Sequence, residues 1–169
     1  MPNIAVVPGD GIGKEVIKEG IKVLKYFNKI EKLNLKFEEV DLGAERYLKY
    51  GELVPDQVLK KLEKFDAIYL GAVGDPRVPT GILEKGILLK LRFYFDQYIN
   101  LRPVKLYDER LTPIKNKETK DIDFVVVREN TEGIYAGLGG FLRKDTPDEI
   151  ATQEMICTRK GVDRIIKYA

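Results

Sequence analysis

Histidine and tryptophan are absent from this 169-residue chain, and cysteine occurs once, as Cys157. A lone cysteine cannot form an internal disulfide, which is typical of a reducing compartment, so we expect a cytoplasmic protein. Without histidine, a general acid or base must be a carboxyl, lysine, tyrosine or cysteine group. These absences leave the chemistry of carboxylates, amines, phenols and a single thiol.

Long apolar runs are also absent: none approaches the roughly 20 residues that a membrane helix needs. The opening residues lack the basic start and apolar core of a secretory signal. The net charge is +2, with both signs interspersed along the chain, whereas a nucleic-acid-binding protein shows a basic patch. We therefore expect neither a membrane nor a nucleic acid as a partner.

Short apolar runs alternate with stretches of helical periodicity in the first half of the chain. Predicted strands cover residues 4–7, 35–40 and 67–70, and predicted helices follow residue 13 and cover 44–50 and 55–65. This alternation is typical of a parallel sheet with helices on its faces.

The second half of the chain is less regular. After a loop at 71–81 we predict a helix at 86–98, an edge or irregular strand at 100–106, a strand at 122–127, a strand within 149–158 and a helix beginning at 162. The polar stretch 108–121 is either a surface loop or a crossing between domains.

The glycine-rich turn PGDGIGKEV lies between the first strand and the first helix. Its glycines, at positions 9, 11 and 13, do not have the Gly-x-Gly-x-x-Gly spacing of the Rossmann dinucleotide fingerprint, and no acidic residue clearly ends the second strand. The simpler interpretation is a tight turn in which glycine permits positive φ and close approach of the backbone.

Three arginines indicate a site for a small dicarboxylic acid. Arg92 lies on a predicted helix, Arg102 on the following strand, and Arg128 at the end of the most apolar strand. Taken singly, each would be an ordinary surface residue. A guanidinium fork fits a carboxylate in bidentate fashion, and ligands of α/β sheets bind at the carboxyl ends of strands. Leu88 and Leu89, one turn before Arg92, suggest that the acid carries an apolar side chain.

Four segments together resemble one known family. They are PGDGIGKEV, GAVGDPRVPTGILEKGILLKLR, INLRPVKLY and DFVVVRENTEGIYAG. In this order they resemble the amino-terminal half of the β-decarboxylating dehydrogenases, which act on isopropylmalate, isocitrate, homoisocitrate or tartrate. The resemblance implies an α/β fold of the isopropylmalate-dehydrogenase type, which is not a Rossmann fold and has a mixed sheet with helices on both faces.

The resemblance also implies roles for particular residues. Arg92, Arg102 and Arg128 would hold the two carboxylates of a malate-type substrate. Tyr135 corresponds to the tyrosine that protonates carbon after decarboxylation.

Other positions correspond to the cofactor cleft of the family. Ile12, Gly71, Gly74 and Glu84 would lie along bound NAD. A divalent metal, Mg²⁺ or Mn²⁺, would polarise the substrate hydroxyl, and no metal ligand is expected among these residues.

In this family the residues before the arginine that corresponds to Arg92 determine which substrate is bound. The resemblance implies a Ser-x-Asn pattern at these positions in an isocitrate dehydrogenase, whereas this chain has Ile87, Leu88 and Leu89. Burying an isopropyl group against leucine is favourable by about 0.8 kcal/mol per CH₂. A third carboxylate buried there would be a charge without a hydrogen-bond donor, which is unfavourable. The first choice is therefore 3-isopropylmalate, an intermediate of leucine biosynthesis. A tartrate, malate or homoisocitrate dehydrogenase, or a non-catalytic dicarboxylate-binding subunit, remains an alternative.

Members of this family are about twice as long, and they carry a catalytic lysine and metal-binding aspartates in the later part. We therefore expect residues 1–169 to be an amino-terminal half that cannot turn over alone. Residues 1–98 would begin the large cofactor-binding domain, and residues 99–169 the smaller domain that binds substrate and forms the usual homodimer.

Overall fold

The computed structural model describes residues 1–169 and divides them into two compact units, unit 1 (Met1–Tyr94) and unit 2 (Phe95–Ala169). Unit 1 contains β1 (Asn3–Gly9), α1 (Ile12–Ile30), β2 (Lys36–Glu39), α2 (Ala44–Tyr50), α3 (Asp56–Leu62), β3 (Ala67–Ala72), a π-helical segment (Glu84–Leu89) and α4 (Lys90–Tyr94). Unit 2 contains β4 (Ile99–Lys105), β5 (Asp123–Glu129), β6 (Gly139–Leu142), β7 (Ile150–Gln153) and α5 (Arg159–Tyr168), with 3-10 turns at Glu109–Leu111, Thr119–Asp121 and Ile134–Ala136.

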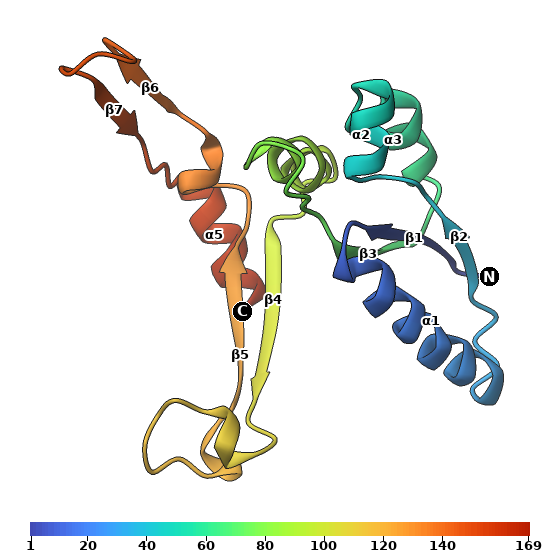
Figure 1. The fold of residues 1–169 in the computed structure, drawn as a ribbon. Helices are drawn as coiled ribbons and strands as arrows, with labels where there is room; N and C mark the ends of the chain where they lie inside the picture. Colours follow the sequence, from blue (N-terminus) through green and yellow to red (C-terminus); the bar gives the residue numbers. More distant parts are fainter. The chain divides into compact units, whose positions relative to one another are not determined.

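Unit 1 is built on a parallel sheet with the strand order β2-β1-β3. Because crossovers between parallel strands are right-handed, the connection through α1 and the connection through α2 and α3 place their helices on opposite sides of the sheet (Figure 1). The central strand is covered on both faces, since Ala5, Val6 and Val7 are all buried. The predicted parallel α/β arrangement is confirmed here.

Helix α1 lies unusually close to the sheet. A side chain at Gly13 would place its Cβ 2.3 Å from the carbonyl oxygen of Pro8 and 2.5 Å from the amide nitrogen of Ala72. Only glycine fits this position, so the glycine-rich turn serves close helix–strand packing. The second strand does end on an acidic residue, Glu39, contrary to the expectation from sequence.

Unit 2 contains two antiparallel strand pairs, β4 with β5 and β6 with β7. The polar stretch 108–121 connects β4 to β5 and is therefore a loop within the unit rather than a crossing between domains. Helix α5 follows β7, and its Thr158 cap accepts a 3.0 Å hydrogen bond from the backbone N–H of Gly161. No helix of the chain combines the length and the apolar character needed to cross a membrane.

Several predicted boundaries are wrong. The helix expected at 86–98 begins at Glu84 and ends at Tyr94, because Asp96 adopts a left-handed φ of 44° that no helix can contain. Strand β3 takes Gly71 and Ala72 from the expected loop. The strand expected within 149–158 is only Ile150–Gln153, and its partner β6 was not predicted.

Candidate functional site

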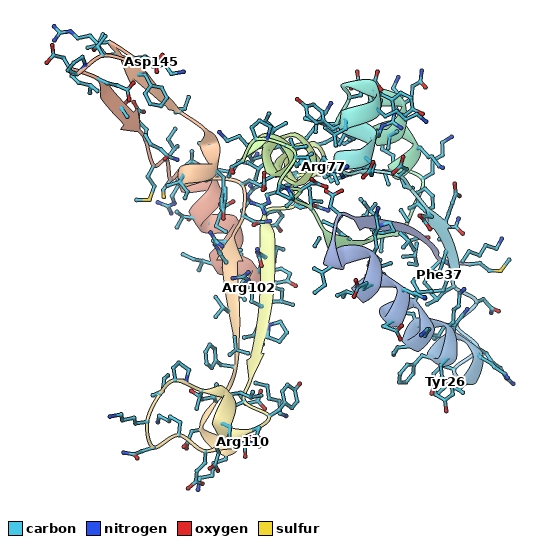
Figure 2. All side chains as sticks on the ribbon, in the orientation of Figure 1. Tyr26, Phe37, Arg77, Arg102, Arg110 and Asp145 are labelled. Atoms are coloured by element: carbon cyan, nitrogen blue, oxygen red, sulfur yellow. The ribbon has the colours of Figure 1, made fainter.

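The pairing of β4 with β5 brings Arg102 and Arg128 to one face of unit 2. Arg102 lies opposite Val126, and Arg128 lies opposite Asn100. Residues two apart on a strand share a face, so the two arginines are diagonal neighbours whose backbone Cα atoms are about 7–8 Å apart. Both arginines are exposed (Figure 2 labels Arg102 on β4). Two of the three predicted cationic forks therefore lie side by side.

Tyr135 is joined to Arg128 directly. The Arg128 Nη2 atom donates a 2.8 Å hydrogen bond to the Tyr135 hydroxyl, and the guanidinium carbon lies 5.3 Å from the centre of the ring. Tyr135 is held in the short 3-10 turn between Gly133 and Gly137, which both have φ near 70°. The chain thus turns back after β5 so that the tyrosine reaches the arginine.

A cavity of about 320 Å³ opens beside this pair, entirely within unit 2. Arg128, Glu129, Glu132 and Tyr135 supply its polar lining, and its apolar lining includes Met155, Cys157, Val162 and Ile165. It is large enough for a small organic acid, and it places such an acid against a cation and a phenol.

Behind the arginine, the Glu129 carboxylate holds the turn in place. It accepts hydrogen bonds from Thr131 Oγ1 at 2.6 Å and from the backbone N–H of Glu132 at 2.7 Å. Burial raises the pKa of Glu129, but the hydrogen bonds from Thr131, Glu132 and Asn130 outweigh burial, so the net pKa lies below the ordinary glutamate value. Arg164 of α5 approaches the same carboxylate at 3.5 Å.

Asn130 completes this support and is buried. Its side-chain NH₂ donates to the carbonyl of Gln97 at 3.1 Å, and its oxygen accepts from Asn100 at 3.2 Å. The segment RENTEG belongs to one of the motifs recognised in the sequence, but only its arginine was predicted to have a role. Polar residues directly after an apolar strand were the available signal for Glu129 and Asn130, whereas nothing in the sequence pointed to Arg164.

Unit 1 holds the remaining predicted substrate residues on one helix. Leu88 and Leu89 lie in the π-helical segment, and Arg92 lies in α4, four residues after Leu88 and three after Leu89. The three side chains are therefore neighbours on the helix surface. Ile87 and Leu91 face the core and are buried, whereas Leu88, Leu89 and Arg92 are half-buried. That this group shares a site with Arg102, Arg128 and Tyr135 stays a prediction.

The predicted cofactor residues fall into two classes. Ile12, 68% exposed, follows β1, and Gly74 follows β3, so both lie at the carboxyl edge of the parallel sheet. A Cβ at Gly74 would come 3.9 Å from Glu84 Oε1, which places the glycine and the glutamate together. Gly71 is different: its Cβ would meet the carbonyl oxygen of Pro8 at 2.3 Å, so it serves strand–helix packing.

Asp10 is a residue of this edge that the sequence did not single out. Its carboxylate is 4% exposed and accepts hydrogen bonds from the backbone N–H groups of Ala44 at 2.7 Å and Gly74 at 3.1 Å. Asp10 thereby ties the turn after β1 to the start of α2 and to the loop after β3. Its place between two glycines in PGDGIG was the only available signal.

No group of three or more Cys, Asp or Glu side chains in residues 1–169 is arranged to hold a metal ion.

A family model described as isocitrate/isopropylmalate dehydrogenase matches residues 3–169. The chain belongs to this family. The resemblance drawn from the four sequence segments is thereby confirmed.

Curated relatives of the family are similar along nearly the whole chain. A 3-isopropylmalate dehydrogenase of Thermobifida fusca is 55% identical over 166 residues, covering 98% of this chain and 47% of the relative. One of Streptomyces griseus is 52% identical over 169 residues, with 99% and 47% covered. The chain therefore spans about half the length of the curated relatives that it matches.

Solved structures of the family share the fold. The crystal structure of an isocitrate dehydrogenase from Methylococcus capsulatus superposes with a TM-score of 0.80 at 30% identity, covering 99% of this chain and 46% of that one. A β-decarboxylating dehydrogenase from Thermococcus kodakarensis gives a TM-score of 0.66 at 27% identity, with 99% and 44% covered. The predicted isopropylmalate-dehydrogenase-like fold is confirmed.

Proposed function

We propose that the protein takes part in leucine biosynthesis as a cytoplasmic, NAD-dependent dehydrogenase that oxidatively decarboxylates 3-isopropylmalate. The observation that carries the proposal is the contact between Arg128 and Tyr135, with Arg102 beside it on the same face. The curated relatives named 3-isopropylmalate dehydrogenase support the choice of substrate. Residues 1–169 would supply the carboxylate grip, and the rest of the polypeptide, in a homodimer, would complete the site.

The arginines would bind the two carboxylates and fix the orientation of the substrate. Arg102 and Arg128 project from one face of the β4–β5 pair, and Arg92 would approach with Leu88 and Leu89 beside it. Leucine side chains favour an isopropyl group because they offer a third carboxylate no hydrogen-bond donor. Fixed geometry lowers the entropic cost of reaching the transition state.

Tyr135 would supply the proton that replaces CO₂ on carbon. In the structure its hydroxyl oxygen accepts the hydrogen bond from Arg128. A neighbouring cation also stabilises the phenolate that proton donation leaves behind. The tyrosine therefore suits the role of general acid in a chain without histidine.

NAD, when bound, would accept the hydride from the substrate carbon. At the carboxyl edge of unit 1, Gly74 has no side chain to block a ligand and Glu84 presents a carboxylate beside it, which suits a ribose hydroxyl. Ile12 would offer an exposed apolar contact. Mg²⁺ or Mn²⁺, implied by the family, would polarise the substrate hydroxyl when bound.

The test compares three variants of the complete polypeptide, with calorimetry for 3-isopropylmalate binding and steady-state kinetics for turnover. Arg128→Ala should weaken binding and lower kcat/KM by at least about tenfold, since a hydrogen bond to a charged group contributes that much. Tyr135→Phe should lower kcat and leave binding nearly unchanged. Arg110→Ala, which removes an exposed arginine from the loop between β4 and β5, is the matched control.

The outcomes separate the alternatives. Binding without turnover in the unaltered protein would indicate a non-catalytic dicarboxylate-binding subunit. Faster turnover of tartrate, malate or homoisocitrate would reassign the substrate within the family. Equal activity of Arg128→Ala and Arg110→Ala would overturn the proposed site.

A further inference from the structure

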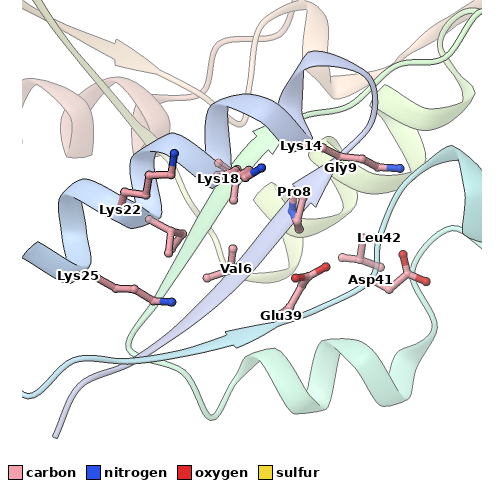
Figure 3. Close-up of a pocket in the computed structure, with 12 residues that line it drawn as sticks. Val6, Pro8, Gly9, Lys14, Lys18, Lys22, Lys25, Glu39, Asp41 and Leu42 are labelled. Carbon is pink, nitrogen blue, oxygen red and sulfur yellow. The ribbon is translucent and has the colours of Figure 1, made fainter.

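A groove of about 520 Å³ lies within unit 1, beside α1 (Figure 3). One wall is a row of four lysines, Lys14, Lys18, Lys22 and Lys25. None of Ile12, Gly71, Gly74 and Glu84 lines it. The groove is therefore separate from the proposed cofactor residues.

The four lysines of this row carry more positive charge than their ion pairs with carboxylates neutralise. Its members are four, four and three residues apart on α1 and so lie along one side of the helix. Like charges at these spacings destabilise a helix. Only Lys22 makes an ion pair, to Glu19 at 2.6 Å. Lys14, Lys18 and Lys25 line the groove without forming an ion pair. Arg77 lowers the pKa of Glu45 and of Asp75, and Lys14 is near enough to add to this effect. Lys22 lowers the pKa of Glu19, and Lys18 adds to that effect.

The opposite wall carries two carboxylates at the carboxyl end of β2. Figure 3 shows Glu39 on that strand and Asp41 on its continuation, and both line the groove. The neighbouring Glu38 points to the other side of the sheet, where it pairs with Lys61 at 2.5 Å. A ligand that reaches Glu39 and Asp41 must therefore offer hydrogen-bond donors, such as hydroxyl or amino groups.

Between these walls the groove is apolar. Its floor includes Val6, Ile17 and Leu42, which belong to the core of unit 1. An inorganic polyanion would match the lysines but would leave the floor unused and would be repelled by the two carboxylates. A long nucleic acid would need a cationic track that extends beyond a groove of this volume.

We propose that this groove binds a nucleoside polyphosphate. The phosphates lie along the lysine row, since lysine binds phosphate as a point charge. The sugar hydroxyls donate hydrogen bonds to Glu39 and Asp41, and the base rests on the apolar floor. Three chemically different parts of one ligand thus meet three different surfaces, and the excess of four lysines over two carboxylates leaves a net positive charge for the phosphates.

The experiment is calorimetry with ATP as the probe, in metal-free buffer, on the complete protein saturated with NAD so that the cofactor cleft is blocked. The variant Lys18→Gln/Lys25→Gln should bind ATP roughly fivefold more weakly, because each exposed ion pair contributes modestly. The control Lys29→Gln/Lys60→Gln removes the same charge from exposed lysines outside the groove and should bind normally. Thermal melting of both variants checks that they are folded.

A third variant separates the nucleotide from its phosphates. Glu39→Gln should weaken ATP binding, yet it should leave tripolyphosphate binding unchanged or tighter because a repelling charge is removed. The proposal is overturned if ATP does not bind beside NAD, if the two double variants weaken it equally, if tripolyphosphate binds as tightly as ATP, or if single-stranded RNA binds more tightly than either.

Discussion

Different interactions stabilise the interior of unit 1 and the interior of unit 2. Among the buried hydrophobic residues of the chain, unit 2 contributes only Leu106, and all the others, from Ala5 to Leu91, belong to unit 1. Unit 2 relies instead on polar contacts: Arg164 donates to Asp96 at 2.9 Å, and Glu132 accepts from the backbone N–H of Thr158 at 2.7 Å. Unit 1 should therefore respond most to lost volume, and unit 2 to lost charge.

The largest expected effect is in the core of unit 1. Leu62 is 1% exposed, and Leu62→Ala should lower the free energy of unfolding by about 2–5 kcal/mol through lost burial and a cavity. The same change at Leu111 of unit 2, which is 71% exposed, should cost less than about 0.5 kcal/mol. Urea unfolding followed by circular dichroism measures both, and similar losses would break the contrast.

The contrast also explains what the sequence could predict. Strand β1 was recognisable because a strand covered on both faces is a continuous apolar run, and Ala5, Val6 and Val7 form one. Strand β6 was missed because it begins with Gly139 and Gly140 and all its residues are exposed, so no alternation marks it. Sequence patterns report burial, and unit 2 has little of it.

The candidate site divides in the same way. The residue types of Arg102 and Arg128 were evident, but their position on one face depends on the register of β4 with β5, which no local pattern specifies. Arg164 hydrogen-bonds to Thr131 at 2.5 Å across 33 positions of sequence, and such contacts arise only when the chain has folded. Local motifs thus identified the candidate carboxylate-binding arginines and missed the residues that support them.

A smaller loss in the free energy of unfolding is expected at Asp10, a buried charged residue in the otherwise hydrophobic core of unit 1. Asp10→Ala leaves the buried N–H group of Ala44 and the N–H group of Gly74 without their acceptor and should cost about 1–3 kcal/mol. Asp10→Asn keeps one acceptor oxygen and should cost less. Urea unfolding gives the magnitudes, and amide exchange at 44 and 74 shows whether the loss is local. Equal losses for the two variants would contradict this expectation and show that one neutral acceptor oxygen cannot replace the carboxylate.

The smallest effect is expected at Glu129 and appears as a dependence on pH. Its folded pKa lies below the ordinary value of 4.5, despite burial, because Thr131 and the following backbone N–H groups donate to the carboxylate. A group with a lowered folded pKa stabilises the fold fully above its unfolded pKa and loses that contribution as the pH falls through the folded pKa. Acidification from neutral pH to below 4.5 should therefore loosen unit 2.

Glu129→Gln tests this pH dependence, because glutamine keeps the shape of the side chain and does not titrate. The variant should be less protected than the natural protein at neutral pH, and its protection should fall less steeply below pH 4.5. Amide exchange at residues 129–132, measured against the amides of β1 as an internal control, follows the two units in one sample. Parallel pH curves for the variant and the natural protein would show that another carboxylate, such as Glu132, controls the acid response of unit 2.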